Sequence, residues 1–83
     1  MTITAESTPN PNALKFVVGV QVGGPVTYRD PGGADDWVHD LFALDGVQQV
    51  FCTSDFVSVT KTADASWDSL ADDVQAVLER AFP

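Results

Sequence analysis

The sequence predicts an α+β domain in which two helices pack on one face of an antiparallel sheet of about four strands. Three observations support this prediction: segments with a period of two, segments with apolar residues at three- and four-residue steps, and their order, strand, strand, helix, strand, strand, helix. The length of 83 residues suits a single domain. We expect this domain to span residues 1–83, with a flexible segment over residues 1–7.

The first half of the chain contains two predicted strands. In ALKFVVGV, residues 13–20, Leu14 and Phe16 alternate with Lys15, and β-branched and aromatic residues are frequent. The Gly-Gly-Pro break that follows ends this strand, and VTYR, residues 26–29, forms a short second one.

Two segments have the spacing of amphipathic helices. The first covers residues near 36–44, with Asp35 as a plausible N-cap and Gly46 at its C-terminal exit. The second begins after Ser66, a good N-cap, and closes the chain. Its apolar stripe consists of Trp67, Leu70, Val74, Val77, Leu78 and Ala81.

Between the helices, VQQVFCTSDFVSVTK predicts a β-hairpin over residues 47–61, interrupted by Thr53 and Ser54. The alternation in its second half places Val57 and Val59 on one face of the strand. We expect that face to contribute to the core.

The charge of the chain restricts its partners. Twelve Asp and Glu against four Lys and Arg give a formal net charge of −8. Such a surface repels nucleic acid phosphates and anionic lipids, so we expect neither nucleic acid nor membrane as a partner. The first residues, MTITAEST, have neither the basic nor the apolar region of a secretory signal, so we expect a cytoplasmic location.

Two groups of residues are candidates for contact with a partner protein. The first is Pro9, Asn10, Pro11 and Asn12, which precede the strand at 13–20. Structurally, they stiffen the entry to that strand and shield an edge of the sheet. Functionally, a rigid segment loses little entropy on docking and suits a recognition loop.

The second group surrounds the predicted hairpin turn. Phe51 and Phe56 flank this turn, with Asp55 between them. An aromatic side chain left exposed beside a carboxylate is a reasonable point of contact for a partner.

Four segments in this order resemble the N-terminal domain of Nfu/NifU-type iron–sulfur scaffold proteins. They are TPNPNALKF, LFALDGVQQVF, DFVSVTK, and a Trp followed by a closing amphipathic helix, and they run from about Thr8 to Phe82. In full-length members of the family, a C-terminal domain with a Cys-x-x-Cys pair holds the cluster. This sequence has no such pair, so the resemblance implies the accessory domain standing alone, without cluster ligands of its own.

The resemblance implies a non-enzymatic accessory or protein-interaction module in iron–sulfur cluster assembly or delivery. Its partners would be assembly or client proteins, and an iron–sulfur cluster would meet this chain only by association. We expect a monomer with no bound cofactor.

Two alternatives depend on Cys52, the single cysteine, and His39, the single histidine. One is a homodimeric iron–sulfur or metal carrier that uses Cys52 with His39 or an outside thiol. The other is a small thiol-dependent enzyme. Because clusters and zinc usually take four protein ligands, we expect Cys52 to be a strand residue of the core and His39 to face solvent.

Overall fold

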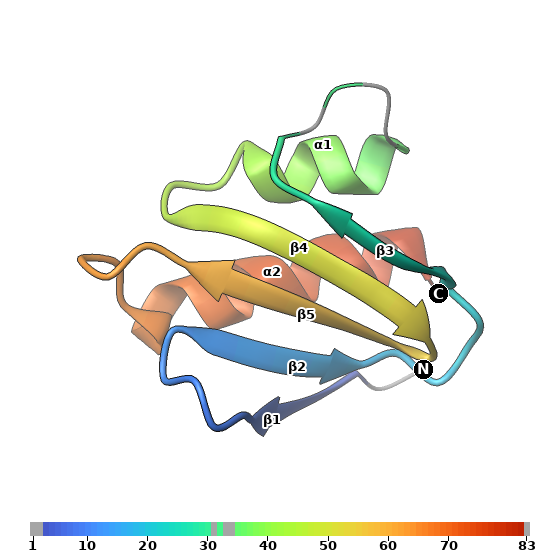
Figure 1. Cartoon of the computed structure of the whole chain (residues 1–83), viewed down its shortest axis with the longest axis horizontal. Helices are drawn as coiled ribbons and strands as arrows, with labels where there is room; N and C mark the ends of the chain where they lie inside the picture. Colours follow the sequence, from blue (N-terminus) through green and yellow to red (C-terminus); the bar gives the residue numbers. More distant parts are fainter. Residues whose placement is uncertain (1–2, 31, 33–34, 83) are drawn as a thin grey trace.

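The computed structural model describes residues 3–30, 32 and 35–82, and this part of the chain forms five strands and two helices, arranged as in Figure 1. The strands pair antiparallel in one sheet of order β1-β2-β5-β4-β3. Their bounds are β1 Thr4–Ser7, β2 Ala13–Val17, β3 Gly23–Tyr28, β4 Val47–Ser54 and β5 Phe56–Lys61, and those of the helices are α1 Asp36–Phe42 and α2 Trp67–Ala81. The α+β class and both helices are confirmed.

The sheet has one strand more than predicted. We expected a flexible segment over residues 1–7, but the structure pairs Thr4–Ser7 with β2 along its whole length and buries Ile3. Residues 1–2 of that segment lie outside the described residues. All four side chains of β1 are exposed, so its sequence has no apolar alternation to indicate a strand. Backbone pairing with β2 holds this segment in place.

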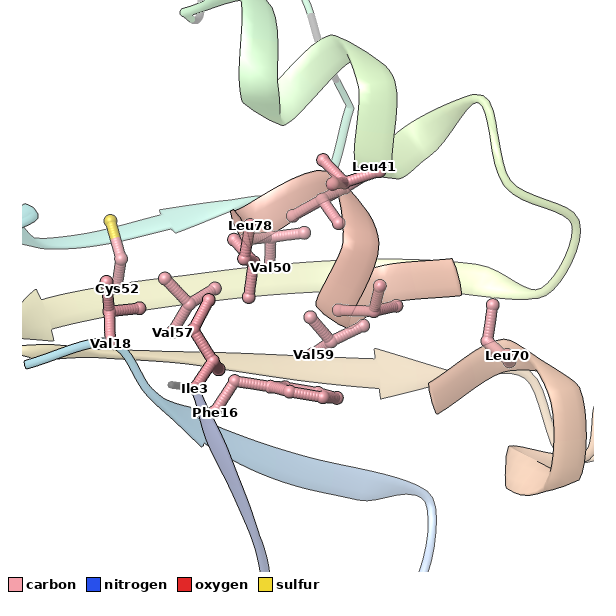
Figure 2. Close-up of a cluster of buried hydrophobic side chains, with 12 residues drawn as sticks. Ile3, Phe16, Val18, Leu41, Val50, Cys52, Val57, Val59, Leu70 and Leu78 are labelled. Atoms are coloured by element: carbon pink, nitrogen blue, oxygen red, sulfur yellow. The ribbon is translucent and has the colours of Figure 1, made fainter. Parts of the chain in front are cut away.

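The core lies between the sheet and the two helices. Val57 and Val59 of β5 are fully buried, which confirms their predicted orientation. Their cross-strand neighbours Cys52 and Val50 on β4 point to the same side (Figure 2). The helices contribute Leu41 of α1 and Leu70, Val74, Val77 and Leu78 of α2, and Ile3, Phe16 and Val18 complete the cluster.

Both predicted N-cap residues occupy the N-cap positions, but only one of them makes a capping hydrogen bond. Ser66 caps α2, and its hydroxyl accepts a hydrogen bond from the Asp68 backbone nitrogen at 3.2 Å. Asp35 occupies the N-cap position of α1, although its side chain makes no capping hydrogen bond. Helix α1 ends at Phe42, before the predicted residue 44.

Gly46 does not terminate α1 as predicted, because it lies in the loop that leads to β4. Its φ is +99°, a conformation that favours glycine. A Cβ atom there would lie 2.7 Å from the Cβ of Ala65. Close packing of this loop therefore requires a residue without a side chain.

The β4–β5 hairpin turns later than predicted. Thr53 and Ser54 belong to β4 rather than interrupting it, and the chain reverses at Asp55. Ser54 has a φ of +52°, which lets the chain turn over a short distance.

The residues Thr8–Asn12, which we call the Pro-Asn loop, connect β1 to β2. The prediction that they shield a sheet edge is wrong, because β1 occupies that edge. Within the loop, the Asn12 backbone nitrogen donates to Oδ1 of Asn10 at 2.9 Å, which is an Asx-type turn. The Thr8 hydroxyl donates to the Asn10 carbonyl at 2.8 Å. These bonds fix the shape of the loop from within.

Contacts from distant parts of the sequence fasten the Pro-Asn loop to the rest of the domain. The Lys61 ammonium donates to Oδ1 of Asn12 at 3.0 Å, and the Lys61 backbone nitrogen donates to the Asn12 carbonyl at 2.7 Å. The Trp67 indole nitrogen donates to the Pro11 carbonyl at 3.2 Å. Lys61 is only 8% exposed, so these bonds also satisfy a buried cation.

Neither of the two described helices combines the length and the hydropathy that crossing a membrane requires.

We predict that Leu78→Ala lowers the free energy of unfolding by about 2–5 kcal/mol, because it leaves a cavity between α2 and the sheet. Chemical denaturation followed by tryptophan fluorescence measures this loss. The neighbouring exposed residue supplies the control, and Glu79→Ala should change the stability by less than about 0.5 kcal/mol. Equal losses in the two variants would contradict this packing.

We predict that Asn12→Ala destabilises the domain by about 1–3 kcal/mol, because it removes an acceptor from a buried ammonium group. Adding Lys61→Met in the same chain should recover part of that loss, since both polar partners are then gone. Denaturant midpoints of the single and double variants measure the coupling. A double variant less stable than Asn12→Ala alone would show that Lys61 stabilises the fold by other means.

Candidate functional site

The side of the sheet away from the helices is a candidate contact surface, which we call the open face. Figure 1 shows α2 passing behind β4 and β5, so that this side of both strands carries no helix. Strand alternation and the pairing registers determine which side chains of each strand point to this side. The set is Thr4, Glu6, Ala13, Lys15, Val17, Thr27, Gln49, Phe51, Thr53, Phe56, Ser58 and Thr60.

Two of the predicted contact residues meet at the centre of the open face. The rings of Phe51 and Phe56 lie 6.2 Å apart between centroids, inclined by 51°. The Lys15 ammonium lies 4.5 Å from the centroid of Phe56, within the range of a cation–π interaction. Both phenylalanines are half-buried, since the neighbouring side chains cover part of each ring. The result is a compact aromatic pair that still presents surface to solvent.

The third hairpin residue lies at one end of this surface. The Asp55 side chain is exposed, while its carbonyl accepts from the backbone nitrogen of Val18 at 2.7 Å and that of Gly19 at 3.2 Å. These bonds tie the hairpin turn to the end of β2. The backbone of Asp55 is therefore held in place, and its exposed carboxylate is free to contact a partner.

The structure does not bring the two predicted contact groups together. Asp55 precedes the first residue of β5, whereas the Pro-Asn loop is bonded to Lys61, the last residue of that strand. Pro9, Asn10 and Pro11 are exposed and Asn12 is half-buried. The two groups form separate surfaces at opposite ends of β5.

Cys52 faces the core and is only 1% exposed. Figure 2 shows it among the buried side chains on the helix side of the sheet. Burial raises the pKa of its thiol, and the carboxylate of Asp35 raises this pKa further. A thiol that resists ionisation is a poor nucleophile and a poor metal ligand.

His39 lies on α1 and is exposed, as predicted. Among the residues that the structure describes, no three His, Cys, Asp or Glu side chains are grouped closely enough to hold a metal ion.

A shallow hollow of about 480 Å³ lies beside the start of α2, and none of the predicted contact residues lines it. The carboxylates of Asp45, Asp64 and Asp73 line it together with several hydroxyl groups. A hydrogen bond from the Thr62 side chain lowers the pKa of Asp64. The hollow is acidic and open to solvent.

Sequence reasoning missed two features of these surfaces. Lys15 and Val17 join the phenylalanines on the open face, and their alternation with Leu14 and Phe16 carried that signal. The anchoring of the Pro-Asn loop by Lys61 had no local signal, because 49 residues separate Lys61 from Asn12.

The chain is similar to known proteins both in sequence and in fold. The model of the family described as "Scaffold protein Nfu/NifU N terminal" matches residues 3–83. The crystal structure of protein SAV1430 from Staphylococcus aureus is similar, with a TM-score of 0.82 and 31% identity, covering 93% of this chain and 98% of that protein. Nearly the whole fold of this chain therefore occurs in another protein as well.

Two curated relatives are longer proteins. NifU-like protein 5, mitochondrial, from Arabidopsis thaliana is 42% identical over 94% of this chain and 30% of its own length. The NFU1 iron-sulfur cluster scaffold homolog, mitochondrial, from Drosophila persimilis is 39% identical over 99% of this chain and 31% of its own length. The chain thus spans about 30% of the length of these relatives.

The names of these relatives correct the prediction of a cytoplasmic location. That prediction used only the absence of a secretory signal, and it is wrong because both curated relatives are named as mitochondrial proteins. The resemblance seen in the sequence is confirmed by a match over nearly all of the chain. The protein belongs to the Nfu/NifU N-terminal family.

Proposed function

We propose that this chain is a non-enzymatic accessory module that binds other proteins during iron–sulfur cluster assembly or delivery. The observation that carries the proposal is the family match over residues 3–83, together with a relative named as an iron-sulfur cluster scaffold. In this proposal the module works as a monomer and meets a cluster only while it is bound to an assembly or client protein.

Two surfaces supply the contacts in this proposal. Phe51 and Phe56 form an aromatic pair, and the adjoining Asp55 adds an exposed carboxylate, a combination typical of interface centres and their rims. The Pro-Asn loop presents exposed side chains on a backbone held by hydrogen bonds at several points. A loop that is already ordered loses little entropy when it docks.

The charge of the chain supports a protein partner in preference to nucleic acid or a membrane. A net charge of −8 repels phosphate groups and attracts basic protein surfaces at long range. We propose that neither nucleic acid nor lipid is a partner.

We predict that the tagged protein recovers cluster-assembly or cluster-receiving proteins from the native lysate of its source. The recovered proteins are identified by mass spectrometry and compared with those bound by the same chain after heat denaturation. Recovery should weaken as salt is raised, because screening reduces attraction to a basic partner. Recovery of no such protein would count against the proposed function.

We predict that neither the wild-type protein nor Cys52→Ala retains stoichiometric iron after anaerobic incubation with iron and sulfide, because burial and a raised pKa withhold the thiolate. Visible absorption and native mass measure the outcome. Colour that stays with a wild-type dimer and disappears in Cys52→Ala would instead identify a carrier that uses this cysteine.

A further inference from the structure

The open face is arranged as rows of side chains that cross the whole sheet. One row follows from the registers, because each residue lies opposite the next on the neighbouring strand. It runs Glu6, Lys15, Ser58, Phe51, Thr27 from β1 to β3. Directly beside it, Val17, Phe56 and Thr53 form a second row. The apolar side chains of both rows therefore gather over the central strands.

The charges of the domain are distributed unevenly between its two sides. On the open face, Glu6 and Lys15 lie directly opposite each other, so their charges offset. The helices carry exposed carboxylates at Asp36, Asp40, Asp68, Asp72, Asp73 and Glu79. The open face is therefore close to neutral in a protein of net charge −8.

We propose that the open face binds an amphipathic helix of a partner protein, with an apolar stripe flanked by Lys and Arg. This inference rests on the proposed function and identifies the surface and the chemistry of its partner. An apolar stripe fits the Phe51–Phe56 pair, where no net charge would be buried. The basic flanks fit Asp55 at one end of this surface and the negative field of the whole domain.

The geometry of the sheet also suits a helix. A helix about 10 Å wide covers two strands spaced about 4.8 Å apart, which here are β4 and β5 with one phenylalanine each. On the opposite side, α2 packs its own apolar stripe on the same sheet. A partner helix would repeat that packing on the uncovered side.

The charges of the domain favour this partner over two other candidate occupants of the open face. A second copy of this chain also carries −8, so two copies repel each other before their open faces meet. Single-stranded nucleic acid can stack on aromatic side chains of a sheet, but Lys15 is the single cation among the open-face residues.

The test uses a synthetic peptide as the partner helix. It has about 15 residues, long enough for four helical turns, with Leu along one face and Lys on the other. A matched peptide replaces every Lys by Glu. Each is titrated into the isotopically labelled full chain, and changes in backbone amide chemical shifts locate the binding surface.

We expect the Leu/Lys peptide to shift the amides of Val17, Phe51, Phe56 and Ser58, and the Leu/Glu peptide to bind much more weakly. The double variant Phe51→Thr, Phe56→Thr removes both rings, places β-branched residues that favour strands at these positions, and should weaken binding about tenfold or more. The matched control, Asp72→Asn with Asp73→Asn on α2, should change the affinity by less than about threefold, because these carboxylates act only through screened long-range attraction.

Four outcomes would overturn the inference. The first three are shifts confined to α1 and α2, an affinity unchanged by the phenylalanine substitutions, and a concentration-dependent dimer of the chain alone that these substitutions abolish. An oligothymidine that binds the open face more tightly than the Leu/Lys peptide would also overturn it.

The same phenylalanine variant separates this inference from the proposed function. If it recovers the same cluster-assembly proteins from lysate as the wild type, the open face is not their binding surface and the proposed function stands. If the wild type recovers none while the Leu/Lys peptide binds the open face, the proposed function fails and the surface assignment stands.

Discussion

The packing of two helices against one side of a five-stranded sheet determines most of the structure. A helix covers about two strands, so α1 and α2 bury the apolar side of the central strands and leave the side chains of the edge strand β1 exposed. Within the described part of the chain, no further element remains for the other side. The sequence meets this constraint by placing hydroxyl groups, two phenylalanines and one offset pair of charges there.

The same constraint explains how much of the fold could be predicted. Val57 and Val59 were assigned to the core from alternation alone, because burial of one face imposes a period of two. The apolar stripe of α2 was predictable because burial of one face of a helix imposes a period of about 3.6 residues. By contrast, β1 is held by backbone pairing and has no buried face, so the apolar pattern carried no information about it.

The candidate surfaces could be predicted from the sequence less completely than the core. Phe51 and Phe56 could be selected because their strand neighbours were assigned to the core, which leaves the opposite face for the two rings. The Pro-Asn loop was recognised as rigid, but its place between two strands and its bonds to Lys61 and Trp67 are tertiary. Contacts between residues far apart in the sequence have no local pattern, so they had to come from the structure.

The strand β1 has a consequence for the behaviour of the protein at high concentration. It pairs only with β2, its four side chains are exposed, and Ile3 is the buried residue that precedes it. Little free energy is needed to detach such an element, compared with opening the core. Detachment would convert β2 into an edge strand, with unpaired backbone groups and the apolar segment Ala13–Val17 available to other chains. While β1 is in place, it keeps these backbone groups of β2 paired and so limits aggregation through that strand.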